Sequence, residues 1–188
     1  MLSTALYNFL QDPKNELVNF KLGYEYELLG QTASAVSFYL RTAENTALTT
    51  LAYESIIRLG LCFKQQTRRP YSTQGRFQQA ISILPNKPEA YFLLSQHYEQ
   101  TQSWLECYTT SIIGQQYGDN YLDLQTDIGY PGGYGLLFEQ AISAWWIGRV
   151  DESLQLLTHL HNSSGINELY QQAIEVNLQK FNKLENRL

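Results

Sequence analysis

Apolar residues recur along the chain at the three- and four-residue spacing of amphipathic helices. Leu17, Phe20, Tyr24 and Leu28 form one such series, which predicts a helix that buries one face. Gly30 follows this series, and glycine is common just past a helix end because it adopts the left-handed backbone conformation without strain. A second apolar series begins after the glycine. This region therefore predicts two antiparallel helices joined by a short turn.

The same helix hairpin recurs along the chain with a period of about 34 residues or slightly more. Each copy places small residues where its two helices would face each other and a larger apolar residue one turn away. Small residues let antiparallel helices approach closely, and the larger neighbour fills the space beside the contact. The corresponding residues are Leu22, Gly23, Tyr26, Gly30, Ala35 and Tyr39; then Leu59, Gly60, Phe63, Phe77, Ala80 and Leu84; then Leu94, Ser95, Tyr98, Gln102, Cys107 and Ser111; then Leu137, Ala141, Ala144, Gly148, Ser153 and Leu157.

This repetition predicts an all-α, single-domain chain over residues 1–188, built as a solenoid of helix hairpins. The predicted elements are hairpins at 14–47, 48–86, 88–116 and 135–162, a loop at 117–134 and a capping helix at 166–186. The second hairpin is expected to carry an inserted loop that contains Arg68 to Gly75. The loop at 117–134 is rich in glycine, so it cannot be one regular helix. Long loops are uncommon in compact domains and are often functional.

The composition narrows the classes of protein to which the chain can belong. Of 188 residues, 44% are hydrophobic and 16% are charged, which argues against a disordered chain. The net charge of −5 disfavours generic nucleic-acid binding. No apolar run approaches the roughly 18 residues that span a bilayer, and no signal-peptide pattern follows Met1. Cys62 and Cys107 lie in apolar helical patterns, so we expect buried thiols and a reducing, cytoplasmic compartment.

The sequence contains no constellation of residues that points to catalysis. His159 and His161 are two residues apart, whereas a helical metal pair needs a spacing of three or four. Neither a Gly-x-Ser-x-Gly elbow nor a phosphate-binding loop is present. Asp119, Asp123 and Asp127 do not follow the alternate spacing of a calcium loop. We therefore expect no enzyme, no catalytic residue, no metal and no cofactor.

The hairpin period and its small residues resemble the tetratricopeptide repeat over residues 13–162. Longer strings resemble, more closely, the helical-repeat region found beside family 2 glycosyltransferase domains in marine bacteriophages and their cyanobacterial hosts. These strings are Gly30–Tyr39, Pro88–Ser95, Trp104, Cys107–Tyr108, Tyr130–Gly132, Tyr134–Glu139 and Ser143–Gly148. The resemblance implies a helical-repeat protein from a phage or phage-like setting. It does not imply catalysis, because the transferase needs a separate fold in which strands alternate with helices.

In this repeat class the first helix of each pair lines a concave face, which is the candidate binding surface. The residues expected on it are Phe20, Tyr24, Glu27, Lys64, Phe92, Gln96, Glu99, Phe138, Ile142 and Trp145. An exposed surface this apolar usually marks an interaction site. The alternative, which the sequence leaves open, is that the solenoid closes on itself or that the 117–134 loop fills the groove.

The leading functional hypothesis is a non-enzymatic scaffold or adaptor that binds another protein and is encoded by a phage, with a place in the virion as one option. The alternative is an accessory helical-repeat module of a glycosyltransferase system. The expected partners are accordingly phage structural proteins or a glycosyltransferase, with no nucleic acid and no membrane. Homo-oligomer formation is left open. The expected location is the cytoplasm of the host cell or the virion.

Overall fold

The structure, a computed structural model, describes residues 2–66 and 69–185, with side chains described as far as Phe181. This part of the chain contains ten α-helices and no strand, which confirms the all-α prediction. The chain divides into two compact units. Unit 1 comprises Met1–Asn86 and Leu122–Ile128, and unit 2 comprises Lys87–Tyr121 and Gly129–Leu188.

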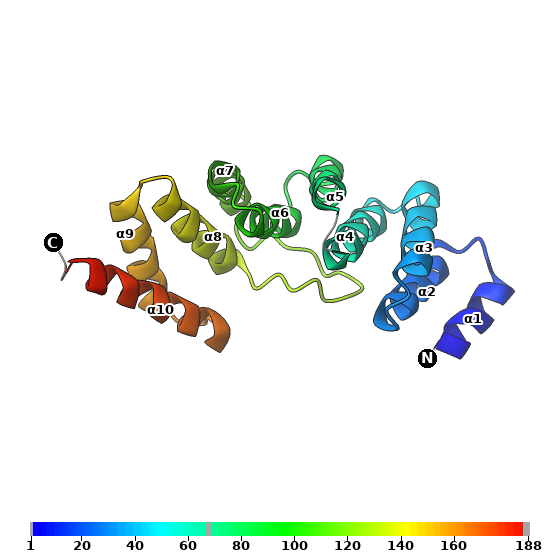
Figure 1. The fold of residues 1–188 in the computed structure, drawn as a ribbon. Helices are drawn as coiled ribbons and strands as arrows, with labels where there is room; N and C mark the ends of the chain where they lie inside the picture. Colours follow the sequence, from blue (N-terminus) through cyan, green and yellow to red (C-terminus); the bar gives the residue numbers. More distant parts are fainter. Residues whose placement is uncertain (1, 67–68, 186–188) are drawn as a thin grey trace. The chain divides into compact units, whose positions relative to one another are not determined.

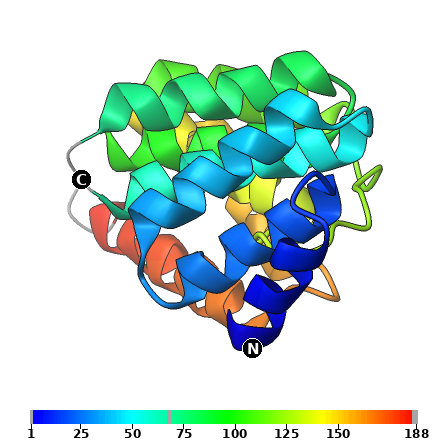
Figure 2. The same ribbon diagram turned by 90° about the vertical axis from the view of Figure 1, so that its right-hand side faces the viewer.

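Unit 1 is a stack of helix hairpins preceded by one short helix (Figure 1). Its helices are α1 (Leu2–Gln11), α2 (Glu16–Leu28), α3 (Thr32–Asn45), α4 (Thr49–Gln65) and α5 (Pro70–Ile83). Each helix packs against the next one along the chain, and α2 also contacts α4. The side-by-side packing of α2 and α3 can be followed in the turned view (Figure 2). Helices α2 and α4 are therefore the first members of two consecutive pairs.

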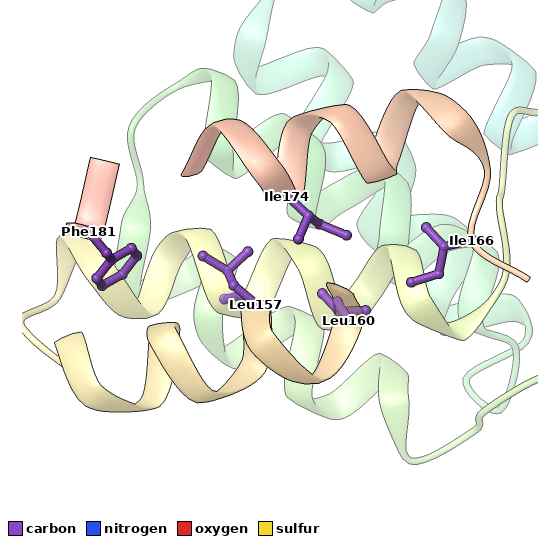
Figure 3. Packing of buried hydrophobic residues seen from close by; sticks show 6 residues of the cluster. Leu157, Leu160, Ile166, Ile174 and Phe181 are labelled. Atoms are coloured by element: carbon purple, nitrogen blue, oxygen red, sulfur yellow. The ribbon is translucent and has the colours of Figure 1, made fainter. Parts of the chain in front are cut away.

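Unit 2 repeats this arrangement and adds a helix at its end. Its helices are α6 (Pro88–Gln100), α7 (Trp104–Gln115), α8 (Gly133–Trp146), α9 (Val150–His161) and α10 (Glu168–Glu185). Consecutive helices pack on each other, and α6 also contacts α8. Leu157 and Leu160 of α9 meet Ile174 and Phe181 of α10 in an apolar cluster that also includes Ile166 (Figure 3). This cluster holds α10 against the last pair.

The small residues predicted to face each other are buried at the helix contacts. A Cβ atom added to Gly60 of α4 would lie 2.5 Å from Cε1 of Phe77 on α5. A Cβ atom added to Gly23 of α2 would lie 3.1 Å from the Tyr39 ring on α3. Ala35, like Phe77 and Tyr39, has no exposed surface. The helices of these pairs can approach so closely because the contact positions carry no larger side chain.

Three turns between paired helices share one backbone geometry. Gly30, Gln102 and Gly148 have φ values of 69°, 58° and 84°, in the left-handed region. In each turn the next residue donates its N–H to a carbonyl five residues earlier, as Gln31 does to Tyr26 at 2.9 Å. This hydrogen bond closes the end of the first helix. Among the described residues, Gln102 is the one non-glycine residue with a positive φ. Its turn therefore carries backbone strain that the two glycine turns avoid.

The expected loop insertion in the second hairpin is wrong from Pro70 to Gly75, whereas Arg68 lies outside the described residues. Helix α5 already begins at Pro70, so Gly75 lies inside a helix rather than in a loop. Proline suits the first turn of a helix because its fixed φ is helical and its missing N–H is not needed there. A single glycine in an exposed helix interior costs only about 1 kcal/mol relative to alanine, which the packing of α5 on α4 overcomes.

Candidate functional site

Unit 1 contains a buried ion pair between α2 and α4, the first helices of its two hairpins, which we call the inner helices. Arg58 Nη1 of α4 lies 3.3 Å from Glu27 Oε1 of α2, and both side chains are less than a tenth exposed. Tyr39 donates its hydroxyl to Glu27 Oε2 at 2.6 Å, and the Arg58 guanidinium lies 4.9 Å from the Tyr24 ring centroid. Buried charges persist only where opposite charges and hydrogen bonds satisfy them. The guanidinium has further N–H groups, and these reach the long loop.

The segment Leu122–Ile128 of the long loop is hydrogen-bonded to two charged side chains of α4, Arg58 as donor and Glu54 as acceptor. Arg58 Nε donates to Thr126 Oγ1 at 2.9 Å, and Arg58 Nη2 donates to the Asp127 carbonyl. The Gln125 N–H donates to Glu54 Oε2 at 2.8 Å, and the Thr126 hydroxyl donates to Glu54 Oε1 at 2.5 Å. The hydroxyl of Thr126 therefore both accepts and donates, and it links the two buried charges of α4.

Burial alternates along this segment, which bends at Gln125 and Thr126. Leu122, Leu124 and Thr126 are half-buried and Ile128 is buried, whereas the residues between them are exposed. Figure 1 shows this part of the chain without helix between α7 and α8. Unit 1 thus holds a segment of the long loop against α4.

Burial raises the pKa values of three titratable groups beside this segment. Burial raises the pKa of the Glu54 carboxyl, although the hydrogen bonds from Thr126 and Gln125 act in the opposite direction. Burial also raises the pKa of the Tyr39 hydroxyl, and the neighbouring Glu27 carboxylate raises it further. The pKa of the Cys62 thiol is raised to about 12, chiefly by burial. A thiol with so high a pKa is a poor nucleophile at neutral pH.

Two hollows in unit 1 flank the bound segment. One, of about 320 Å³, lies beside Asp127 and Ile128 and is lined by Glu27, Arg58 and Lys64, among others. The other, of about 430 Å³, lies beside Gln125 and Thr126. Its remaining lining residues come from α1 and α2: Thr4, Ala5, Asn8, Phe20, Lys21, Tyr24 and Glu25. Residues of the segment therefore form part of the wall of both hollows.

Unit 2 has a larger and more apolar cavity, of about 830 Å³. Its walls come from α6 to α10: Glu99, Trp104, Phe138, Ile142, Trp145, Trp146, Ser153, Leu157, Ala173, Asn177, Lys180 and Phe181. All three tryptophans of the chain line it. Trp104 and Trp146 stack with ring centroids 5.0 Å apart, and Trp146 is 59% exposed. Trp145 meets Phe181 edge to face at 4.6 Å.

The acidic residues of the long loop do not converge. Asp119 Oδ1 accepts the Gly133 N–H at 3.1 Å, so a carboxylate of the chain already lies at the start of α8. Asp123 and Asp127 are exposed residues of the segment bound to unit 1. Within the described residues, no group of three or more His, Cys, Asp or Glu side chains is placed to hold a metal ion.

The residues predicted for the binding surface differ in their exposure and surroundings. Phe20 and Phe92 are 1% exposed, which corrects the expectation that they face an open groove. Phe20 packs on Tyr39 at 5.5 Å, and Phe92 is covered edge to face by Tyr130 of the long loop at 5.4 Å. Packing thus buries the aromatic rings of Phe20 on α2 and Phe92 on α6. The long loop covers Phe92, whereas Phe20 packs on α3.

The remaining predicted residues keep some exposed surface. Tyr24, Glu27 and Lys64 line the hollows of unit 1. The side chain of Gln96 hydrogen-bonds Tyr170 of α10, within unit 2. The residues that share the large cavity of unit 2 are Glu99, Phe138, Ile142 and Trp145. Four of the predicted residues are therefore brought together at one site.

Sequence reasoning missed Glu54, Arg58 and Thr126, which hold the segment Leu122–Ile128 against α4. Two signals could have found them. Opposite charges four residues apart share one helix face, as Glu54 and Arg58 do in an otherwise apolar helix. The alternation of Leu122, Leu124, Thr126 and Ile128 with polar residues also predicts an extended, half-buried segment.

Comparisons with known proteins identify the fold. No protein-family model matches the sequence, and no curated protein is significantly similar to it. Among solved structures, the crystal structure of MamA superposes with a TM-score of 0.64 at 17% identity, over 82% of this chain and 81% of MamA. The structure of PilF from Pseudomonas aeruginosa superposes with a TM-score of 0.65 at 14% identity, over 90% of this chain and 69% of PilF.

A third similar structure is that of YrrB, a tetratricopeptide-repeat (TPR) protein with an unusual peptide-binding site. Its TM-score is 0.65 at 10% identity, over 87% of this chain and 76% of YrrB. Identities this low show a shared fold alone. The chain is therefore a tetratricopeptide-like helical-repeat protein in its fold. No helix of the described residues is both long and apolar enough to span a bilayer.

Proposed function

We propose that this chain is a non-enzymatic scaffold that binds a partner protein, and that the cavity of unit 2 receives apolar side chains of that partner. The observation that carries the proposal is the cavity of about 830 Å³ walled by Trp104, Trp145 and Trp146. Ligand cavities commonly enclose about 300–1,000 Å³ and have mostly apolar, aromatic walls with few polar groups. Glu99, Ser153, Asn177 and Lys180 supply the polar positions of this wall.

The exposed tryptophan favours a protein partner. Tryptophan is enriched among the residues that dominate the energy of protein interfaces, because it buries a large rigid surface at little entropic cost. Trp146 exposes 59% of its surface while one face of its ring is held against Trp104. This rigid aromatic surface is ready to be covered without prior rearrangement. The tetratricopeptide-like fold supports the same class of function, since YrrB has a peptide-binding site.

The test is binding by purified protein with and without the tryptophans of the cavity. Partners are captured on the immobilised chain, and the binding of each purified candidate is titrated by intrinsic tryptophan fluorescence. Because all three tryptophans line the cavity, burial there shifts the emission directly. The Trp145→Ala, Trp146→Ala double variant should weaken binding by about 30-fold or more, the loss typical of interface hot spots.

Tyr71→Ala is the matched control, because Tyr71 is an aromatic residue of unit 1 that is 87% exposed and lies outside the cavity. This variant should bind as the unaltered chain does. Circular dichroism checks that helicity persists in both variants. If the double variant binds its partner as tightly as Tyr71→Ala does, the proposed site is wrong.

The origin of the partner follows from the sequence resemblance. We propose a phage structural protein as the first candidate and a family 2 glycosyltransferase as the second, because the chain resembles the helical region beside such transferases. Mass spectrometry of proteins captured from the native source distinguishes them. Capsid or tail proteins would support a virion adaptor. A transferase would support the accessory-module role, and a transfer assay with and without this chain would then test it.

A further inference from the structure

Helix α6 of unit 2 carries a carboxyl group at the position that forms an ion pair in unit 1. Glu27 of α2 lies three residues before the turn residue Gly30, and it pairs with a guanidinium group of α4. Glu99 of α6 lies three residues before Gln102, whose backbone has the same left-handed conformation. Glu27 and Glu99 are therefore equivalent residues of two hairpins.

Helix α8 carries a second carboxyl group where unit 1 has the guanidinium group. Arg58 of α4 lies two residues before the small contact residue Gly60. Glu139 of α8 lies two residues before the buried small residue Ala141, and it is itself 3% exposed. Unit 2 thus has two acidic side chains, Glu99 and Glu139, where unit 1 has one acidic and one basic side chain.

The two carboxyl groups of unit 2 act on the same neighbours. Burial raises the pKa of the Cys107 thiol, and Glu139 and Glu99 raise it further. Burial also raises the pKa of the Tyr170 hydroxyl, and the same two carboxyl groups raise that pKa further. Cys107 belongs to α7 and Tyr170 to α10, so the negative potential extends across several helices of unit 2.

The charge of the whole of unit 2 has the same sign. Its sequence contains ten Asp or Glu residues and five Lys or Arg residues, whereas unit 1 contains eight of each. The net charge of −5 of the chain therefore belongs to unit 2. A surface with one sign of charge attracts groups of the opposite sign, so this unit favours a cationic ligand.

We propose that the cavity of unit 2 recognises a guanidinium group, and that the partner protein inserts an arginine side chain there. This inference rests on the function proposed above and specifies the chemistry of the partner. The apolar stem of arginine packs on the aromatic wall, while its guanidinium stacks on a ring and meets Glu99. Unit 1 contains the same combination within its own chain, since Arg58 pairs with Glu27 and lies over the Tyr24 ring.

A buried hydroxyl in the cavity wall independently indicates a ligand with hydrogen-bond donors. Ser153 of α9 lines the cavity and is 1% exposed, and its Oγ has no hydrogen-bond partner among the described residues. A buried polar atom without a partner is unfavourable, and an N–H of a ligand removes that cost. A guanidinium group has five N–H donors and no acceptor, which suits a wall with a hydroxyl oxygen and the carboxyl group of Glu99.

The other residues of the wall leave room for this cation. Lys180 is the basic residue among the described lining residues. Its side chain is exposed, and its ammonium group donates to Asn177 Oδ1 on the same helix at 3.4 Å. Trp146 is 59% exposed although one face of its ring stacks on Trp104. Arginine suits this wall better than lysine, because a planar guanidinium both stacks on rings and binds a carboxylate through two N–H groups.

The test uses two small molecules in place of the partner, n-butylguanidinium and n-butylurea, which are titrated into the full chain. They share the butyl group and have nearly the same shape, but only butylguanidinium is charged. Binding is followed through the indole N–H signals of the three tryptophans in ¹H–¹⁵N NMR, because all three line the cavity. Butylguanidinium should bind at least about tenfold more tightly than butylurea.

Glu99→Gln removes the charge of the wall and keeps the shape of the side chain. This variant should bind butylguanidinium and butylurea with similar affinities. Glu106→Gln is the matched control, because Glu106 is an exposed residue of α7 that lies outside the cavity. It removes the same charge from unit 2, and its preference for butylguanidinium should equal that of the unaltered chain.

Ser153→Ala provides a second variant in case Glu99→Gln does not fold. Alanine should be tolerated at this position, because the equivalent residue of the first hairpin is the buried Ala35. The loss of the hydroxyl should weaken the binding of butylguanidinium by about fivefold or more.

Equal affinities of the unaltered chain for the two molecules would overturn the proposal. So would a Glu99→Gln variant that keeps the preference of Glu106→Gln, or a Ser153→Ala variant that binds butylguanidinium as tightly as the unaltered chain. None of these outcomes decides whether a partner protein uses the cavity, which the Trp145→Ala, Trp146→Ala variant tests separately.

Discussion

Adding one methyl group at Gly60 tests whether the close helix approach in the second hairpin stabilises unit 1. In the Gly60→Ala variant the new Cβ would lie 2.5 Å from Cε1, 2.8 Å from Cδ1 and 3.1 Å from Cζ of Phe77. Contacts shorter than about 3 Å do not occur between carbon atoms in folded proteins, so the ring or the helix must move. Phe77 has no exposed surface, and its ring therefore has no solvent to move into.

Two opposing effects decide how much Gly60→Ala changes the free energy of unfolding. Replacing glycine by alanine inside a helix stabilises it by about 1 kcal/mol. Overpacking a close-packed contact costs about 1–3 kcal/mol. The net effect should be a loss of up to about 2 kcal/mol in the free energy of unfolding.

Gly75 supplies the matched control in the same hairpin. It lies within α5, is exposed, and has no atom of another residue within 4 Å of an added Cβ. Gly75→Ala should therefore gain about 1 kcal/mol without any packing cost. For a chain of this size, that gain raises the melting temperature by about 2–4 °C. The difference between the two variants isolates the packing cost at Gly60.

The assay is urea denaturation of both variants and the unaltered chain, followed by circular dichroism. A smaller ring partner should relieve the clash, so Phe77→Leu should cost less in the Gly60→Ala background than in the unaltered chain. If Gly60→Ala stabilises the chain as much as Gly75→Ala does, the close approach of α4 and α5 is wrong.

Four further predictions concern a buried small residue, one turn and the two thiols. Gln102→Gly should stabilise the chain by about 0.5–1 kcal/mol in urea denaturation, since glycine relieves its positive φ; destabilisation would contradict that turn geometry. Ala35→Leu should cost about 1–3 kcal/mol by overpacking a residue with no exposed surface, and an unchanged melting temperature would refute this. Cys62 and Cys107 should react with a thiol reagent at pH 8 only after denaturation, because both thiols are buried. Burial also raises the pKa of both thiols, that of Cys62 to about 12. Rapid labelling of the folded chain would contradict this prediction. The raised pKa means that the contribution of Cys62 to stability is present below pH 9.0 and is lost as the pH rises toward about 12, which urea denaturation at several alkaline pH values measures.

The sequence alone determined the helical hairpins and their contact positions. Helical periodicity is local, since residues three and four apart share a face whatever the rest of the chain does. The small residues at Gly23, Gly60 and Ala35 follow from the same logic, because a close helix pair excludes larger side chains. The start of α5 was misjudged because Pro70 and Gly75 favour a loop locally, whereas packing against α4 stabilises the helix.

Only the tertiary structure decided which inner residues remain accessible. Glu54 and Thr126 are 72 residues apart in the chain, and nothing in the local pattern of either segment specifies that they meet. The path of an irregular loop depends on such non-local contacts, because its backbone makes no regular hydrogen bonds of its own. For the same reason, the sequence could place Phe20, Phe92 and Trp145 on equivalent helices but could not predict which of these side chains is buried. Packing buries the first two, whereas Trp145 lines an open cavity.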